Sequence, residues 1–311
     1  MSESGDYSPG DWKGYDFDNA RKAYDVHVGR SYNEAKKDNK RVSDLIPLCL
    51  ETNSPAPLVI LCDVTGSMGN WPAVIFSKLP YLDNECKEYL GEDMEVSFAA
   101  TGDMQDSYPL QVRAFHKGRE LETQLKELVI EGGGSGPESA HEAYELAALY
   151  YSRNVKMPQA KHPILIFIAD EFFHDTIDQQ LAKVGHIDIK KTHNTMDVFE
   201  ELKKKFAVYV IRKPYSGADD EINKQWTMAL GEDHIAMLDD PSRVVDVIFG
   251  ILAKETDKIK YFKQEIEERQ NAGQVATVYK SLKTIHMLPE DASKSVMHTT
   301  LKGKLTKKLL P

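Results

Sequence analysis

Cysteine is scarce in this chain. Its 311 residues include three cysteines, Cys49, Cys62 and Cys86. An odd, sparse set argues against a disulfide-stapled secreted scaffold, and the spacing fits no common zinc module. A chain of this length, with 41% hydrophobic residues, can instead bury a sizeable apolar core.

Long apolar runs are also lacking. No stretch approaches the roughly 20 apolar residues that cross a bilayer. Residues 1–40 are polar and densely charged, without the apolar region of a signal peptide. We therefore expect a cytoplasmic protein.

Positive charge is in the minority, with 39 Lys and Arg against 49 Asp and Glu and a net charge of −10. This balance argues against general nucleic-acid binding. The segment from Gln270 onward differs, since it has seven lysines and two acids. In the simplest interpretation it is a solvated terminus; in the alternative it binds an acidic partner or the acidic body of the chain.

Apolar runs and helical periods alternate through the middle of the chain. Continuous apolar segments at Leu58–Asp63 and Pro163–Asp170 predict strands that are buried on both faces. The alternation is typical of an α/β domain with a doubly wound, mostly parallel sheet flanked by helices. We place this domain at residues 57–254. An irregular N-terminal arm (1–56) precedes it, and a C-terminal helix and basic tail (255–311) follow.

The patterning also predicts the extent of each element. Strands are expected at residues 58–63, 95–100, 110–115, 163–170, 206–211 and 234–238. Helices are expected at residues 71–89, 120–129, about 138–151, 195–205, 221–230, 241–253 and 259–270.

Two of the predicted strands end in an aspartate, Asp63 and Asp170. Ligands of open parallel sheets bind at the carboxyl ends of strands, so these carboxylates are the first candidates for a site. Thr65 and Ser67 follow Asp63 in one tight loop, and Ser135 lies in a glycine-rich loop before a predicted helix. Five oxygen donors without sulfur or imidazole suit Mg²⁺ or Mn²⁺ rather than zinc. Because Mg²⁺ seldom takes all its ligands from one protein, a partner's carboxylate is the natural sixth ligand.

The motif Asp63-x-Thr65-x-Ser67 after an apolar strand resembles the first motif of the von Willebrand factor type A (vWA) domain. That family has a Rossmann-like fold and a metal-ion-dependent adhesion site (MIDAS). The glycine-rich loop with Ser135 and the strand-terminal Asp170 resemble its second and third motifs, in the family's order. The resemblance implies that Thr65 and Ser67 ligate the ion directly, and that Asp63 and Asp170 hold it partly through water.

Two features depart from the family's pattern within the matching segment, about residues 57–253. Ser135 stands where Thr is more usual, and the Gly-Gly-Gly-x-x-Pro-Glu loop resembles that of intracellular members. Glu171 stands where Gly is common and adds negative charge at the rim. The intracellular resemblance implies a partner such as an AAA+ ATPase of the MoxR type, or a larger assembly. We therefore expect a non-enzymatic, metal-binding vWA module for protein–protein interaction that uses magnesium.

Other functions could use the same residues. In a purely structural interpretation, Asp63 caps its loop and Ser67 caps the next helix. A metal-dependent hydrolase or phosphotransferase would use the ion as a Lewis acid, but the sequence shows no paired base and nucleophile and no P-loop. In a third interpretation the chain is a structural subunit whose metal is capped by its own arm, through Asp16 or Asp18, or by a neighbouring copy.

A group of histidines follows the second aspartate-terminated strand. His174, His186 and His193 lie in a polar stretch, with Asp175 beside the first of them. They could form a second metal patch or serve in acid–base chemistry. Exposed polar residues on a loop near the site are the simpler interpretation.

Overall fold

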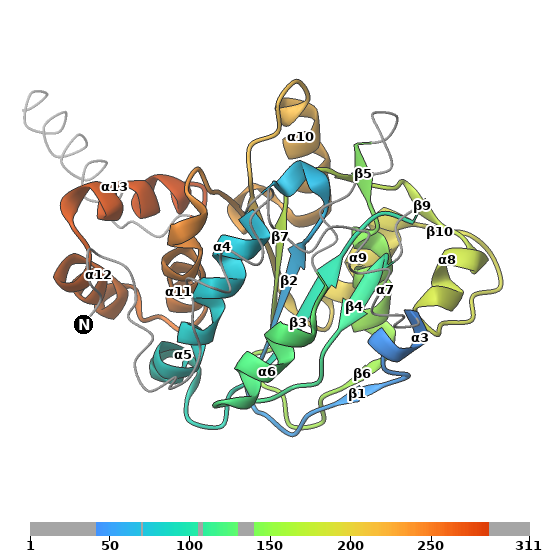
Figure 1. Ribbon diagram of the computed structural model, residues 1–311, viewed down its shortest axis with the longest axis horizontal. Coiled ribbons are helices and arrows are strands. Elements are labelled where there is room, and N and C mark those ends of the chain that lie inside the picture. Colours follow the sequence, from blue (N-terminus) through green and yellow to red (C-terminus); the bar gives the residue numbers. More distant parts are fainter. Residues whose placement is uncertain (1–41, 70, 105–107, 130–139, 286–311) are drawn as a thin grey trace, which may run out of the picture.

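A six-stranded sheet crosses the middle of the molecule in the computed structural model of Figure 1, which describes residues 42–69, 71–104, 108–129 and 140–285. Neighbouring strands in the sheet pair in parallel from one edge as far as β3, and β4 pairs antiparallel with β3 at the other edge. In spatial order the strands are β12 (Ile235–Met237), β11 (Ala207–Arg212), β7 (Ile164–Ala169), β2 (Pro57–Asp63), β3 (Glu95–Thr101) and β4 (Leu110–Val112).

The order of the strands reverses in the middle of the sheet. If the six strands are numbered in chain order from β2, their spatial order from the β4 edge to the β12 edge is 3-2-1-4-5-6. The reversal therefore falls between β2 and β7. In open α/β sheets, chain crossovers on the two sides of such a point leave in opposite directions, and ligands bind at the carboxyl ends of the two central strands. Asp63 ends β2, and Asp170 directly follows β7.

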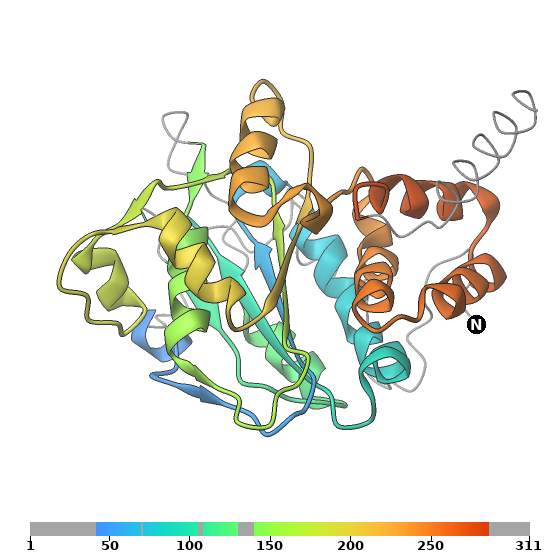
Figure 2. The same ribbon diagram turned by 180° about the vertical axis from the view of Figure 1, so that it is seen from behind.

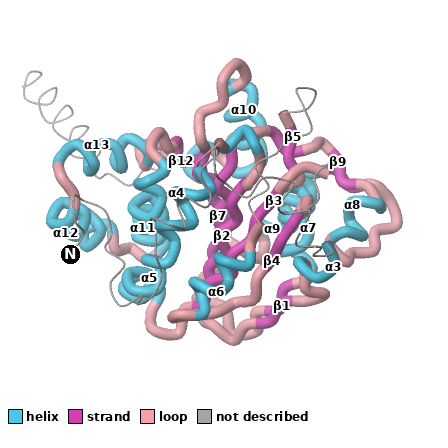
Figure 3. Tube along the Cα trace, in the orientation of Figure 1, coloured by secondary structure: helices cyan, strands magenta, loops and turns pink. Residues whose placement is uncertain are grey.

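Helices cover both faces of the sheet, as Figures 1 and 2 show from opposite sides and Figure 3 shows by element type. Alternate residues of β2 point to opposite cores, with Leu58 and Ile60 in one and Val59 and Leu61 in the other. The first core contains residues of α4 (Trp71–Lys78), α5 (Leu82–Leu90), α6 (Glu120–Glu127), α11 (Val244–Glu255), α12 (Ile259–Arg269) and α13 (Ala272–Ser281). The second contains residues of α7 (Tyr144–Arg153), α8 (Gln179–Val184), α9 (Thr195–Lys203) and α10 (Asp219–Leu230).

The expected α/β architecture, a mainly parallel sheet flanked by helices, is confirmed, and the largest differences from expectation concern two helices. The helix expected at residues 71–89 is divided into α4 and α5 by a 3-10 turn at Leu79–Tyr81 that contains a proline. Proline has no amide hydrogen for the α-helical ladder, which explains the interruption. The helix expected from about residue 138 begins instead at Tyr144, because β5 (His141–Glu142) pairs with β8 (Phe172–Phe173).

Both terminal extensions contribute regular structure where they are described. After α3 (Val42–Leu45), β1 (Leu50–Glu51) pairs in parallel with β6 (Val155–Lys156), which attaches this part of the arm to the domain. Beyond α12, the chain forms α13 rather than entering a tail directly, and Asn271 and Gln274 make a capping box at its start. Residues 1–41 and 286–311, the rest of the arm and of the basic tail, lie outside the described residues.

Short elements complete the described chain. These are β9 (Thr176–Ile177), β10 (His193–Asn194), and 3-10 turns at Gly66–Met68, Glu232–His234 and Pro241–Arg243. Within the described ranges, no helix has the length and apolar character needed to cross a membrane.

Candidate metal centre

The loop after β2 is folded around the carboxylate of Asp63. Oδ1 of Asp63 accepts hydrogen bonds from the backbone N of Thr65 at 2.8 Å and from its Oγ1 at 2.6 Å. Oδ2 accepts a hydrogen bond from the hydroxyl of Tyr144, the first residue of α7. Asp63 has no exposed surface and Thr65 is 1% exposed. Three donors therefore hold this carboxylate in one orientation beneath the loop.

Ser67 connects the ends of the two central strands. Its Oγ donates to Oδ1 of Asp170 at 3.1 Å, across a sequence separation of 103 residues. Oδ2 of Asp170 accepts from Nζ of Lys213 at 2.9 Å, and the same Nζ donates to the backbone oxygen of Ser67 at 2.6 Å. The loop after β2, the end of β7 and the end of β11 thus meet at one place.

The two hydroxyl oxygens are arranged as neighbouring ligands of a cation would be. Oγ1 of Thr65 and Oγ of Ser67 lie 3.2 Å apart, and each hydroxyl has a carboxylate to accept its proton, Asp63 and Asp170 respectively. Adjacent oxygens around Mg²⁺ at its usual bond length of roughly 2.1 Å are about 3 Å apart. With both protons directed to the carboxylates, lone pairs on both oxygens are available to a metal ion. The residues present fit Mg²⁺ or Mn²⁺.

The site brings together two buried carboxyl groups, Asp63 and Asp170, and the ammonium group of Lys213. Burial, reinforced by the charge of Asp170, raises the pKa of Asp63 well above its usual range. Burial also raises the pKa of Asp170, although the ammonium of Lys213 opposes that effect. Two positive groups lie near Asp170: the ammonium of Lys213, which is paired with its carboxyl group, and the guanidinium of Arg212, which donates to its backbone oxygen at 3.4 Å. A further cation at this place would relieve the cost of keeping both carboxyl groups ionised.

Glu171 adds a third carboxyl group beside the site. It is 5% exposed, and it interacts with the side chains of Ser67, Tyr215 and Glu142. Burial, followed by the charge of Asp170, raises the pKa of Glu171. Glu171 was expected to add negative charge at the rim of the site. Its carboxyl group is instead mostly buried and contacts Ser67 within the site.

Four of the five predicted ligands come together. Asp63 and Thr65 interact directly, and Ser67 lies between Thr65 and Asp170. Ser135 lies outside the described residues. In the described part of the chain, no group of three or more His, Cys, Asp or Glu side chains gathers as a metal site.

Sequence patterns alone missed Tyr144 and Lys213. Lys213 directly follows β11. The rule that ligands bind at the carboxyl ends of parallel strands, which identified Asp63 and Asp170, could therefore have identified Lys213 as well. Nothing local marks Tyr144, because its role depends on where the start of α7 lies relative to β2.

The histidines after β7 do not gather into one patch. Nε2 of His174 lies 3.3 Å from Oδ1 of Asp103, and its ring stacks on that of His141 at 5.2 Å. His186 instead hydrogen-bonds to the backbone oxygen of Ile46, and His193 lies in β10. The alternative of a second metal patch is therefore not supported, because these three side chains do not come together.

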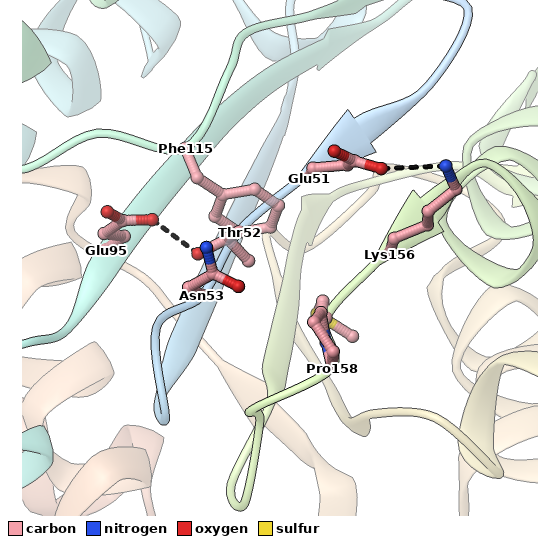
Figure 4. A pocket seen from close by; sticks show the side chains of 8 residues that line it. Glu51, Thr52, Asn53, Glu95, Phe115, Lys156 and Pro158 are labelled. Atoms are coloured by element: carbon pink, nitrogen blue, oxygen red, sulfur yellow. Dashed lines mark hydrogen bonds and ion pairs between the residues drawn. The ribbon is translucent and has the colours of Figure 1, made fainter.

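A cavity of about 600 Å³ lies at the opposite end of the sheet (Figure 4). Glu95, the first residue of β3, lines it and accepts a hydrogen bond from Thr52. Glu51 and Lys156, also in its lining, form an ion pair at 2.8 Å. Each charged side chain of the lining thus has a partner within the lining, and the cavity lies at the amino ends of the strands, away from the carboxyl ends of β2 and β7.

No family model and no curated protein matches this chain. Among solved structures, it aligns with two crystal structures of the pilus adhesin SpaC from Lactobacillus rhamnosus GG, one in an open conformation. The TM-scores are 0.44 and 0.43, at 11% and 10% sequence identity over 71% of this chain. The chain spans 32% and 31% of the length of those structures. At this level, neither fold nor function transfers from the adhesin to this chain.

Proposed function

We propose that this chain is a vWA-type protein-binding module whose site at the ends of β2 and β7 holds Mg²⁺ and accepts a carboxylate from a protein partner. The observation that carries the proposal is the pair of hydroxyl oxygens, Thr65 Oγ1 and Ser67 Oγ, 3.2 Å apart. Their protons have separate acceptors, Asp63 at the end of β2 and Asp170 directly after β7. The reversal of strand order at this place supports the same assignment.

Each side chain has a distinct role in the proposal. Thr65 and Ser67 are direct ligands, since their lone pairs are available. Asp63 and Asp170 orient those hydroxyls and supply the negative charge, with water completing their contact to the ion. When bound, Mg²⁺ supplies an electrophilic position for the partner's Asp or Glu. Ser135 is a further proposed ligand from the glycine-rich loop.

Tyr144 and Glu171 belong to the surroundings of the site. The hydroxyl of Tyr144 binds the second oxygen of Asp63, which keeps the first oxygen toward Thr65. Glu171 contacts Ser67 and would reinforce attraction for a cation. The role is one of binding rather than catalysis. We propose a MoxR-type AAA+ ATPase as the partner, and with it a cytoplasmic location, because the glycine-rich loop resembles that of intracellular vWA proteins.

Calorimetric titration of the metal-stripped protein with Mg²⁺ and Mn²⁺ tests the metal part of this proposal. The wild type should bind one ion saturably, and the Asp63→Ala/Ser67→Ala variant should lose that binding. Asp188→Ala, which removes an exposed carboxylate from the segment after α8, is the control and should bind as the wild type does. Equal binding by the wild type and the double variant would contradict the assignment.

A pull-down comparison tests the protein-binding part. A partner retained in Mg²⁺, released by EDTA and lost with the double variant would support carboxylate capture at this site. A partner that binds equally in Mg²⁺ and in EDTA would show that recognition does not depend on the ion.

A further inference from the structure

Lys213 occupies the position of a counter-ion in the candidate site. Its backbone N donates to the oxygen of Ala169 at 2.9 Å, which extends the pairing of β11 with β7 by one residue. The sheet register therefore fixes Lys213 beside Asp170. Its side chain is 19% exposed, whereas the side chain of Asp170 has no exposed surface.

The ammonium group is surrounded by groups that attract cations. Nζ lies 2.9 Å from Oδ2 of Asp170 and 2.6 Å from the backbone oxygen of Ser67. It also lies 5.8 Å from the ring centre of Trp71, within reach of a cation–π interaction. A carboxylate oxygen, a backbone oxygen and an aromatic face together hold one positive charge at the mouth of the site.

We propose that Lys213 competes with the divalent cation for Asp170 and thereby sets the metal affinity of the site. The inference rests on the proposed metal-binding function. When Asp63 and Asp170 are both ionised to receive the ion, the charge of Lys213 leaves them with one net negative charge instead of two. A divalent ion next to Ser67 is also repelled by the ammonium. In this proposal, the ion displaces Lys213 from Asp170 when it binds.

The length and mobility of a lysine side chain make this exchange possible. Lysine carries a compact charge on a flexible four-carbon stem, so Nζ can leave Asp170 without movement of β11. Since the side chain is already partly exposed, the released ammonium can reach solvent. The site then has two exclusive states, one closed by Lys213 and one loaded with metal.

Calorimetry on the full-length, metal-stripped chain tests the competition. Lys213→Met should bind Mg²⁺ roughly tenfold more tightly than the wild type, or better, because one unit charge is removed from the immediate surroundings of the ion. Lys191→Met removes the same charge from an exposed position between α8 and β10, and should leave the affinity unchanged. Circular dichroism of each variant would check that it is folded, and Lys213→Gln provides a second neutral variant.

The possible results separate this inference from the proposed function. Saturable Mg²⁺ binding of equal or lower affinity in Lys213→Met and Lys213→Gln would overturn the role of Lys213 while the metal site stands. Binding that appears only when Lys213 is neutralised would support it strongly. Absence of binding in all variants would overturn both the competition and the metal site.

Tryptophan fluorescence offers a second measurement that is independent of affinity. If Lys213 leaves Asp170 when Mg²⁺ binds, the ammonium also leaves the face of Trp71. The wild type should therefore show a Mg²⁺-dependent change in fluorescence that is absent from both Lys213→Met and Trp71→Phe. The same change in Lys213→Met would contradict the withdrawal of the lysine.

Discussion

Glu145, in the first turn of α7, is a carboxyl group with no exposed surface. Oε2 accepts a hydrogen bond from the backbone N of His174 at 3.2 Å, while Oε1 has no hydrogen-bond partner in the described part of the chain. Burial, opposed in part by the charge of His174, raises the pKa of Glu145 from 4.5 to about 8. The folded protein therefore keeps this group protonated at neutral pH.

The raised pKa determines how stability should depend on pH. Between pH 4.5 and about 8, the folded chain retains a proton on Glu145 that the unfolded chain has lost. The free energy of unfolding therefore falls as the pH rises through this interval. The part of the unfolding free energy that depends on the protonated Glu145 is fully present below pH 4.5 and fully lost above about pH 8. The difference between these two pKa values corresponds to a change of about 5 kcal/mol in the free energy of unfolding.

The substitution Glu145→Gln isolates that contribution, because glutamine has nearly the same shape and carries no charge at any pH. The difference in unfolding free energy, variant minus wild type, should increase by about 5 kcal/mol from pH 4.5 to pH 9. Urea denaturation of both proteins at intervals of half a pH unit would measure it. The contributions of other titrating groups to the unfolding free energy are the same in both proteins and cancel in the difference.

The exposed Glu221 of α10 provides the matched control, since Glu221→Gln should follow the wild-type curve throughout. A difference between Glu145→Gln and the wild type that stays constant within about 1 kcal/mol from pH 5 to pH 9 would refute the reasoning. It would mean that Glu145 has the same affinity for protons in the folded and unfolded chains.

Two further predictions concern packing and thiol exposure. Gly250 of α11 faces Leu282 so closely that an added Cβ would clash with it, so Gly250→Ala should destabilise the chain by about 1–2 kcal/mol in urea denaturation. In a Leu282→Ala background the same change should stabilise instead, through the better helix propensity of alanine; destabilisation in both backgrounds would contradict the packing argument. Cys49 is exposed whereas Cys62 and Cys86 are buried, where burial raises the pKa of both thiols. A thiol reagent should therefore label one cysteine rapidly in the native protein and all three after unfolding, and rapid native labelling of Cys49→Ser would argue against this burial.

Local patterns were sufficient to predict the central strands. The apolar runs that form β2 and β7 have no polar residue before the terminal aspartate, which is possible only where both faces of a strand are buried. The extents of these strands were therefore predicted to within a residue or two. The positions of Asp63 and Asp170 at strand ends followed from the same pattern.

Local sequence patterns gave wrong predictions where a contact with a segment distant in the sequence determines the local structure. The start of α7 depends on the pairing of β5 with β8, and the glycine-rich sequence before β5 does not predict that pairing. The helix α13 is stabilised partly by burial of Val278 and Leu282 in the core beside α11, so a lysine-containing segment expected as a tail is helical.

The sequence by itself determined which atoms are available to the candidate site, namely the oxygens of Asp63, Thr65, Ser67 and Asp170. Their proximity is a property of the tertiary structure alone. The parallel register of β2 and β7 brings Ser67 within 3.1 Å of Asp170, across 103 residues of sequence. Extension of the pairing between β11 and β7 puts Lys213 on the same carboxylate. Charge balance at the site depends on distances between strands, and those are determined only when the sheet forms.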